Sequence, residues 1–440
     1  MAAPRMTVLG TGYLGATHAV CMASLGFEVL GLDVDASKVA RLAAGEVPFY
    51  EPGLEALLRK TLATGRLRFT TSYEEVAEFG DVHFLCVGTP QKEHENGADL
   101  DYVYTAVTSL APLLTRPCVF AGKSTVPVGT AERIATRISE IAPAGEGVEV
   151  VWNPEFLREG FAVEDTLHPD RLVFGVTSSR GEEALRAAFA PVIDTGTPVV
   201  ITDLATAQLV KVAANAFLAT KISFINAMAE VCEVAGGDVT KLSEALSHDT
   251  RIGGRFLGAG LGFGGGCLPK DIRAFMARAG ELGVDQALSF LSEVDAINLR
   301  RRARMVDLAR EQLDDSVAGR RIGVLGAAFK PNSDDIRDSP ALDVAAKLHS
   351  LGADVAVYDP AAMDNARLRY PDLRYVESTL EAADGAHLVL LLTEWLEFRE
   401  ADPEVLAEVV ALRSIVDGRN ALDPDRWRAA GWTYRALGRP

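Results

Sequence analysis

Short apolar runs alternate with helix-forming stretches along the first 200 residues or so of the chain. The first run, Met6–Leu9, leads into a glycine-rich turn, a stretch of small residues and a second apolar run closed by Asp33. Three later runs each end in a loop of polar residues and proline, at Thr89-Pro90, Ser124-Thr125 and Asn153-Pro154-Glu155. The alternation predicts a doubly wound α/β domain, in which ligands bind at the carboxyl ends of the strands.

The first turn has the spacing of a dinucleotide-binding motif. Gly10-x-Gly12-x-x-Gly15 follows an apolar strand and opens a helix, and Asp33 closes the next strand. The glycines allow a tight turn, close approach to a pyrophosphate and close helix packing, while the acid suits a ribose 2′-hydroxyl. An acid at position 33 favours NAD over NADP.

Two stretches in the middle of the chain contain no glycine or proline between their ends. We expect the first, Pro198–Gly236, to form one long helix, and the second, Val284–Ala318, to form another. A helix so long and so apolar must be covered by flanking domains or by a second copy of the chain. We therefore expect a homodimer.

An α/β pattern begins again near residue 320. The stretch RRIGVLGAAFKP resembles the first strand and its turn, but it has only Gly323 and Gly326, without a third glycine at the right spacing; the next strand ends at Asp359, which suggests a degenerate Rossmann unit. The predicted fold is therefore α/β, with two Rossmann-like doubly wound domains, 1–197 and 316–440, joined by a central helical domain, 198–315.

Composition narrows the class of protein. The chain has 440 residues and a net charge of −17, which argues against general nucleic-acid binding. It has no uninterrupted apolar run of about 18 residues, and its N-terminus does not resemble a signal peptide. We expect a cytoplasmic protein with no membrane or nucleic-acid partner.

The five cysteines are widely spaced and contain no CxxC pair, so a disulfide framework or metal site is not expected. Cys267 lies in Gly262–Asp271, GFGGGCLPKD, after three glycines and before Pro269, Lys270 and Asp271. It could be a packing residue or a nucleophile. The flexible and charged surroundings favour the nucleophile, because nearby cations stabilise a thiolate.

A nucleophilic thiol beside an NAD domain indicates oxidation at the aldehyde level. A thiolate adds to an aldehyde, the adduct gives up hydride, and water cleaves the resulting thioester. Glu155 is the candidate general base. Lys211 and Asn215, four apart on the predicted helix, share one face; they could form a solvated stripe or belong to the active site.

Eight ordered motifs then carry a resemblance that covers nearly the whole chain. The motifs GTGYLG, VPFYEPGLE, VGTP, KSTVPVGT, NPEFLREG, KVAANAFLATKISFIN, GFGGGCLPKD and FKPNSDDIRDSP resemble those of the UDP-glucose/GDP-mannose dehydrogenase family, most closely its UDP-glucose branch. The resemblance implies oxidation of the C6 hydroxymethyl group of UDP-glucose to the carboxylate of UDP-glucuronate, with NAD and water, for polysaccharide biosynthesis.

The resemblance also implies roles for individual residues. The implied catalytic residues are Cys267, Lys211, Asn215, Asp271, Glu155 and Thr125. Those implied for NAD are Gly10, Gly12, Tyr13, Leu14, Gly15, Asp33, Lys38, Thr89, Thr125, Glu159, Lys270 and Arg337. Those implied for the sugar nucleotide are Glu155, Phe156, Leu157, Glu159, Lys211, Asn215, Arg251 (from the partner subunit), Phe256, Leu257, Gly258, Gly260, Gly264, Phe329, Lys330 and Arg419.

Two positions depart from the family pattern. Gly266 stands where many relatives have serine, and Trp152 stands where a small polar residue is common. Three alternatives also stay open: a dehydrogenase of GDP-mannose, UDP-N-acetylglucosamine or UDP-N-acetylmannosamine; a non-catalytic NAD-binding regulator; and a simple alcohol dehydrogenase in which Cys267 only packs.

Overall fold

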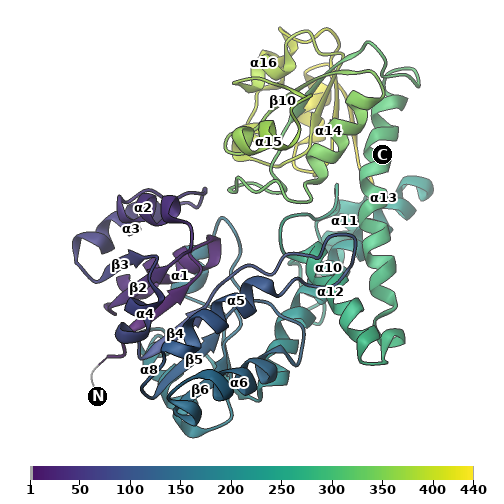
Figure 1. Ribbon diagram of the computed structural model, residues 1–440. Coiled ribbons are helices and arrows are strands. Elements are labelled where there is room, and N and C mark those ends of the chain that lie inside the picture. The colour runs from purple at the N-terminus through teal and green to yellow at the C-terminus, as the bar shows by residue number, and fades with distance from the viewer. Residues whose placement is uncertain (1–2, 440) are drawn as a thin grey trace. The chain divides into compact units, whose positions relative to one another are not determined.

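The structure is a computed structural model that describes residues 3–439 (Figure 1). It divides into two compact units. Unit 1 comprises the chain up to Ala214 together with Arg273–Gly283, and unit 2 comprises Asn215–Ile272 together with the chain from Val284 onward. The division passes through two helices, α10 (Leu204–Ala235) and α12 (Leu268–Glu281).

Unit 1 is built on one eight-stranded sheet with the strand order β3-β2-β1-β4-β5-β6-β7-β8. Neighbouring strands are parallel except for β6 and β7, which are antiparallel. The strands are β1 (Met6–Leu9), β2 (Val29–Leu32), β3 (Leu67–Thr70), β4 (Val82–Leu85), β5 (Cys118–Gly122), β6 (Val148–Trp152), β7 (Leu172–Gly175) and β8 (Val199–Thr202).

Both faces of this sheet are covered, which explains why its central strands are apolar without alternation. Val8 and Phe84 belong to one core and their neighbours Leu9 and Leu85 to the other. The first core includes α1 (Tyr13–Ser24), α3 (Leu54–Ala63) and α8 (Ser179–Ala188), and the second includes α4 (Tyr73–Phe79), α5 (Asp101–Leu110) and α6 (Thr130–Ile141). The remaining helices are α2 (Ala36–Ala43), α7 (Ala162–Leu167) and α9 (Ala190–Ile193).

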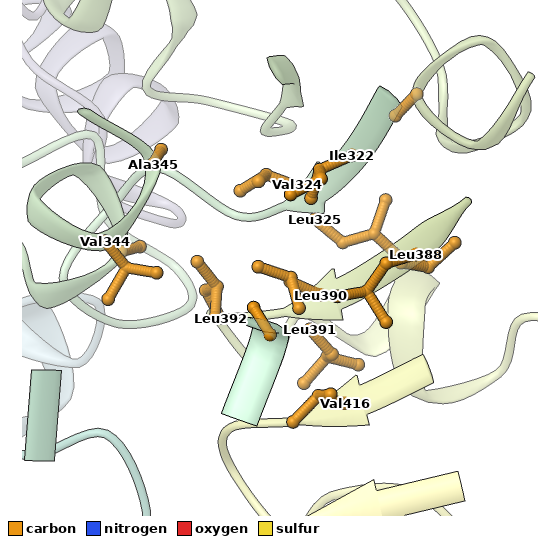
Figure 2. Packing of buried hydrophobic residues seen from close by; sticks show 14 of the residues in the cluster. Ile322, Val324, Leu325, Val344, Ala345, Leu388, Leu390, Leu391, Leu392 and Val416 are labelled. Atoms are coloured by element: carbon orange, nitrogen blue, oxygen red, sulfur yellow. The ribbon is translucent and has the colours of Figure 1, made fainter. Parts of the chain in front are cut away.

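Unit 2 contains a six-stranded parallel sheet with the order β11-β10-β9-β12-β13-β14. Figure 2 shows its core, where Val324 of β9, Leu390 of β12 and Val344 of α14 lie together. The strands are β9 (Arg321–Leu325), β10 (Asp354–Tyr358), β11 (Arg374–Tyr375), β12 (Leu388–Leu391), β13 (Ser414–Asp417) and β14 (Thr433–Ala436). Its helices are α11 (Val239–Ser247), α13 (Phe290–Glu311), α14 (Pro340–Ser350), α15 (Met363–Arg369), α16 (Thr379–Ala383), α17 (Leu396–Arg399), α18 (Pro403–Ala407) and α19 (Pro424–Ala429), besides its parts of α10 and α12.

The two long helices are shorter than the breaker-free stretches predicted. The first stretch begins with a strand, β8, because the β-branched residues Val199–Thr202 pair with β7, and Asp203 then caps α10 by accepting from Thr206 N at 2.7 Å. The second helix, α13, ends at Glu311 because Asp314 and Asp315 adopt left-handed backbone angles.

Helix α10 is long and apolar enough to span a membrane, the only such helix within residues 3–439. In its most apolar window 44% of the residues are already buried inside the protein. The helix also carries Lys211 and Asn215, both buried. Such a helix is also typical of the core of a water-soluble protein.

Candidate active site

The glycine-rich turn of unit 1 has the shape that a pyrophosphate needs. Gly10 has φ +87°, and a Cβ on Gly15 would lie 1.8 Å from the Gly10 carbonyl oxygen. Gly12 differs, because a Cβ there would meet nothing within 4 Å. Gly12 is also the N-cap of α1 and supplies no side-chain cap, so the first N–H groups of the helix, around Tyr13 and Leu14, are available to an anion.

Asp33, at the end of β2, lies next to this turn. Its Oδ2 accepts hydrogen bonds from Thr11 N at 2.9 Å and from Lys38 Nζ at 3.0 Å. Burial alone would raise the pKa of Asp33, but the hydrogen bonds from Lys38, Asp35 N and Thr11 N outweigh it and hold that pKa below its ordinary value. Asp33 is therefore a fixed carboxylate, as an acceptor for ribose hydroxyls must be, and the residues of this turn fit an NAD molecule.

A buried glutamate joins this helix to the loop after β6. Glu51 accepts from Gly160 N and Ala162 N, both at 2.7 Å, and from the Tyr13 hydroxyl. Burial, reinforced by Glu51, raises the pKa of Tyr13. The motif that contains Glu51, VPFYEPGLE, carries part of the family resemblance, but nothing in the local sequence predicts this contact of Glu51.

The loops after β4 and β5 are joined at the carboxyl edge of the sheet. The Thr89 hydroxyl donates to the Thr125 carbonyl at 2.7 Å, and Ser124 donates to the Val87 carbonyl at 2.7 Å. Trp152, at the end of β6, is paired in register with Gly122 of β5. A Cβ at Gly122 would lie 2.1 Å from the indole ring, so the glycine makes room for the tryptophan that departs from the family pattern.

Lys211 of α10 and Glu155 form a buried ion pair, with 2.9 Å between Nζ and Oε1. Their side chains are only 6% and 12% exposed, so water screens the pair weakly. The second oxygen of Glu155 accepts from Leu157 N at 2.7 Å, which fixes the carboxylate in its loop. An ammonium and a carboxylate in contact can exchange a proton, as acid–base catalysis requires.

The ring of Phe156 lies beside two cations. The guanidinium carbon of Arg171 is 3.6 Å from the ring centroid and the Lys211 ammonium is 5.7 Å from it. Burial lowers the pKa of Arg171, while Asp170 and Glu155 act in the opposite direction. Arg171 was not among the residues predicted from the sequence. Its loop, His168–Arg171, contains two charged residues before a buried strand, which is a weak signal by itself.

In unit 2, Cys267 lies immediately before α12, which begins at Leu268. This differs from the flexible loop expected from the glycines, because Pro269 belongs to the first turn of a helix, where proline is favourable. Cys267 is exposed, whereas the other four cysteines are buried. A helix N-terminus stabilises a thiolate, so the position suits a nucleophile.

Asn215, Lys270 and Asp271 form a cluster in unit 2 with Cys267 close in sequence. The Asn215 amide donates to Asp271 Oδ2 at 2.7 Å, and Lys270 Nζ lies 2.5 Å from Asp271 Oδ1. Asp271 lies in the first turn of α12 and is buried. Both oxygens of the Asp271 carboxylate are thus bound, one by Asn215 of α10 and one by Lys270 of the same helix, α12.

The three glycines before Cys267 are packed against the segment that follows β9. Added Cβ atoms would lie 2.2 Å from the Asp338 carbonyl oxygen at Gly264, 2.8 Å from the Phe329 ring at Gly265 and 2.2 Å from the Arg337 guanidinium at Gly266. The segment is therefore closely fitted as well as glycine-rich. Lys330, also predicted to contact substrate, lies over the Phe329 ring at 5.4 Å.

The segment Phe256–Gly260 is held against helix α10. Leu257 packs with Ile225 and Ala229 of α10, and Gly260 N donates to Asn226 Oδ1 at 2.8 Å. Gly258 has open space where a Cβ would be, and Phe256 is partly exposed with φ +64°. This leaves one side of the segment accessible to a ligand.

Arg419 and Arg251, both predicted to contact substrate, lie in different surroundings. The Arg419 guanidinium donates to the carbonyls of Leu392, Gly262 and Phe329, at 2.7, 2.8 and 3.2 Å, and so joins three loops of unit 2. Arg251 is on the surface and pairs with Asp249.

The predicted site residues therefore form two groups. Unit 1 contains the NAD turn, Thr89, Thr125, the loop Glu155–Glu159 and Lys211, and unit 2 contains Asn215, Cys267, Asp271 and the sugar-nucleotide residues of its loops. Within residues 3–439 no three His, Cys, Asp or Glu side chains are grouped so as to hold a metal ion.

Three family models match successive parts of the chain. They are the NAD binding domain of the UDP-glucose/GDP-mannose dehydrogenase family at residues 4–193, its central domain at 205–300 and its UDP binding domain at 323–424. A UDP-glucose 6-dehydrogenase of Rhizobium meliloti is 40% identical over 99% of this chain and 100% of its own.

Solved structures give the same result. A UDP-glucose dehydrogenase from Pyrobaculum islandicum is 39% identical, with a TM-score of 0.91 over 99% of this chain and 98% of its own. A UDP-D-ManNAc dehydrogenase from Pyrococcus horikoshii is 26% identical, with a TM-score of 0.87 over 99% of each chain.

Proposed function

The chain belongs to the UDP-glucose/GDP-mannose dehydrogenase family and is an NAD-dependent oxidoreductase; on this premise we propose that it oxidises C6 of UDP-glucose to give UDP-glucuronate. The full-length identity of 40% to a UDP-glucose 6-dehydrogenase carries the choice of substrate, since the relative that acts on UDP-D-ManNAc is only 26% identical. A dehydrogenase of another sugar nucleotide is the alternative.

Lys211 and Glu155 act as the acid–base pair. Lys211 stabilises the C6 oxygen as its proton leaves, and its buried position makes that stabilisation strong. Glu155 takes a proton from the water that cleaves the thioester, and Thr125 helps to hold this water. Asn215 and Asp271 support the same reaction, and their mutual hydrogen bond fixes the amide and carboxylate relative to each other.

Cys267 forms the covalent intermediates. Its sulfur adds to the C6 aldehyde, the aldehyde oxygen takes up a proton, and a thiohemiacetal results. After the second oxidation the product is a thioester, and water displaces the sulfur to give the carboxylate and the free thiol. The helix N-terminus at Leu268 stabilises the thiolate both as attacking and as leaving group.

Several residues hold NAD, which, when bound, accepts hydride from C6. Gly10, Gly12, Gly15, Tyr13 and Leu14 surround the pyrophosphate, and Asp33 with Lys38 binds the adenosine ribose. Thr89, Thr125, Glu159, Lys270 and Arg337 complete the cofactor site.

The residues that we propose for the sugar nucleotide come from both units of the chain. In unit 1 these are Lys211 and the loop residues Glu155, Phe156, Leu157 and Glu159. In unit 2 they are Asn215, Phe256, Leu257, Gly258, Gly260, Gly264, Phe329, Lys330 and Arg419, with Arg251 reaching the site of a partner subunit.

A homodimer is supported by an apolar stripe on α10. Phe217, Phe224 and Val231 are spaced by seven residues, about two helical turns, and are 67%, 49% and 59% exposed. A Phe217→Asp variant should be monomeric in sedimentation experiments, while Leu368→Asp, on exposed Leu368 of α15, should leave the dimer intact.

The division of labour follows three parts of the chain. Residues 1–197 bind NAD, residues 198–315 form the dimer and supply Cys267, and residues 316–440 bind the UDP moiety. The enzyme is cytoplasmic, has no membrane or nucleic-acid partner, and supplies UDP-glucuronate for polysaccharide biosynthesis.

The experiment that tests the proposal is a panel of sugar nucleotides, with NADH counted per sugar consumed. UDP-glucose should give two NADH per molecule. One NADH would indicate a simple alcohol dehydrogenase, and none with any sugar would indicate a non-catalytic NAD-binding protein. NADH formed with GDP-mannose, UDP-N-acetylglucosamine or UDP-N-acetylmannosamine but not with UDP-glucose would overturn the assignment of UDP-glucose as the substrate.

Turnover of a Lys211→Met variant tests the acid–base pair. The loss of a buried cation that stabilises the developing oxyanion should lower kcat on the order of 10²–10³-fold. NAD affinity should stay the same, because the NAD turn does not involve Lys211. Unchanged turnover would remove Lys211 from the mechanism.

A further inference from the structure

Lys123 is a buried cation that the proposed reaction does not use. It follows β5 and is 6% exposed, and its ammonium donates to Asn153 Oδ1 at 2.9 Å. The ammonium also lies 5.9 Å from the Phe84 ring centroid and 5.4 Å from that of Phe189. Within residues 3–439 no carboxylate comes within ion-pair distance of it. Burying an ammonium in this way is costly, so a packing role alone explains it poorly.

Its partner, Asn153, is the first residue after β6 and joins three strands. Asn153 N donates to the Gly122 carbonyl of β5 at 2.8 Å, and its side-chain Nδ2 donates to the Val173 carbonyl of β7 at 3.1 Å. An ammonium can only donate, so it requires the amide oxygen to face β5 and the amide nitrogen to face β7. Lys123 therefore fixes which way the Asn153 amide points.

Glu155 comes two residues after Asn153, in the same loop. One of its oxygens is held by Lys211 and the other by Leu157 N. Burial lowers the pKa of Lys123; Cys86 and Glu155 act in the opposite direction, and Lys211 lowers it further. Lys123 is thus within electrostatic reach of the acid–base pair as well as connected to it through the chain.

We propose that Lys123 is a positioning residue for Glu155, which holds the Asn153 amide in one orientation and so fixes the path of the chain from β6 to the general base. The inference rests on the proposed role of Glu155 in cleaving the thioester. It predicts that Lys123 controls the lifetime of the acyl adduct on Cys267 without contacting substrate or NAD.

The test follows the adduct on Cys267 by intact-protein mass spectrometry after the enzyme is mixed with UDP-glucose and NAD. In a Lys123→Met variant the adduct should accumulate and decay on the order of a hundredfold more slowly, since small displacements of a catalytic group have effects of this size. The affinities for UDP-glucose and NAD should not change. An unchanged adduct lifetime would overturn the proposal.

A double variant separates positioning from simple hydrogen-bond satisfaction. Asn153→Leu should slow adduct decay as Lys123→Met does, and it replaces that variant if Lys123→Met does not fold. The double variant, with both Lys123→Met and Asn153→Leu, leaves no unpaired ammonium. Its unfolding temperature should therefore be higher than that of Asn153→Leu alone, but decay of the adduct should stay slow. If decay recovers together with stability, Lys123 only stabilises the fold and the proposal is wrong.

His83→Leu is the matched control. His83 Nδ1 and Thr7 Oγ1 form a fully buried pair, 2.8 Å apart, on β4 and β1 of the same sheet. This variant should lower the unfolding temperature and leave the adduct lifetime unchanged; an equal slowing would overturn the proposal. If the wild-type enzyme forms no adduct and gives no second NADH, the proposed function itself fails, which is a different outcome.

Discussion

The two sheets of the molecule have the same strand order but different chemistry. In unit 1 strands β3-β2-β1-β4-β5-β6, and in unit 2 strands β11-β10-β9-β12-β13-β14, follow the same pattern of connection. In both units the first strand, β1 or β9, is followed directly by a glycine with positive φ, Gly10 at +87° and Gly326 at +114°. The two units diverge in the connection between that glycine and the next helix.

In unit 1 the helix begins at Tyr13, three residues after Gly10, so its N-terminus lies at the glycine-rich turn, where we propose that the pyrophosphate of NAD binds. In unit 2 the next helix, α14, begins only at Pro340. The residues in between form a long segment that packs against the three glycines before Cys267 and carries Phe329, Lys330 and Arg337.

The aspartates that follow the second strand of each sheet, Asp33 after β2 and Asp359 after β10, also differ in the groups that they bind. Asp33 binds Thr11 and Lys38 beside the NAD turn. Asp359 accepts from the N–H groups of Ala327, Ala328, Ala361 and Ala362 and from Trp395 Nε1. Asp359 thus stabilises its own loops. The two units therefore share their strand order and differ in the connection after the first strand and in the partners of the acid after the second.

The largest expected effect concerns Cys267, which has no counterpart in unit 1. Cys267→Ser should lower turnover on the order of 10³-fold or more, because a neutral hydroxyl is a poorer nucleophile, and an alkoxide a poorer leaving group, than a thiolate. NAD affinity, measured by calorimetry, should not change and serves as the control. Wild-type turnover would mean that unit 2 contributes only binding.

Replacing a glycine of each turn by alanine, Gly15 in unit 1 and Gly326 in unit 2, should affect NAD binding in the first turn and stability in the second. Gly15→Ala places a Cβ against the Gly10 carbonyl oxygen and should weaken NAD binding on the order of a hundredfold, about 2.7 kcal/mol. Gly326→Ala places a Cβ 2.4 Å from Thr393 and should cost about 2–4 kcal/mol of unfolding free energy without changing NAD affinity. Equal effects on NAD would contradict the comparison.

Replacing Asp33 or Asp359 by asparagine should affect two different properties, NAD binding in the first case and stability in the second. Asp33→Asn should weaken NAD binding about tenfold, since a hydrogen bond to a charged group is lost. Asp359→Asn should lower the free energy of unfolding by about 1–3 kcal/mol, because an amide group cannot accept all five hydrogen bonds, and should leave NAD binding unchanged. Calorimetry and thermal unfolding measure the two effects.

The pH dependence of Asp33 gives a smaller effect with a definite sign. Because the pKa of Asp33 is lower in the folded chain than in the unfolded chain, its stabilising contribution is fully present above the ordinary carboxyl value of about 3.9. It is lost only as the pH falls through the lower folded value. Carboxyl-carbon NMR should show that titration, and a midpoint at or above the ordinary value would contradict it.

Gly266→Ser should have the smallest effect. The added Cβ meets the guanidinium of Arg337, the far end of an exposed side chain that can move aside. The change in the free energy of NAD binding should therefore stay within about 0.5 kcal/mol, roughly twofold. A much larger change in the KM for NAD would show that Arg337 must lie against the backbone at residue 266.

Local patterns predicted much of the fold and part of the site. The three apolar runs before Thr89, Ser124 and Asn153 are strands, and the residues Gly10–Gly15 form the tight turn between a strand and a helix that their spacing predicted, because each depends on neighbours in sequence. The start of α10 has a signal in the sequence, because Asp203 is a typical N-cap residue, but the absence of glycine and proline alone does not mark it.

The contacts of Lys123, Glu51 and Arg171 could not be predicted in the same way. Glu51 contacts Gly160 and Lys123 contacts Asn153, and both pairs are distant in sequence. Nothing in the residues around Lys123 shows that its ammonium is buried beside the rings of Phe84 and Phe189. Such roles depend on the packing of the whole sheet, which a single sequence does not specify locally.

The packing of Trp152 on Gly122 restricts the order in which these two positions can evolve. While the indole of Trp152 is present, any side chain at position 122 collides with it, so only glycine is tolerated there. A smaller residue at 152 must therefore come first in any mutational path, and only then can position 122 diversify. Lineages that have both tryptophan and a larger residue at 122 should not exist, and descendants of this chain should lose the tryptophan before they lose the glycine.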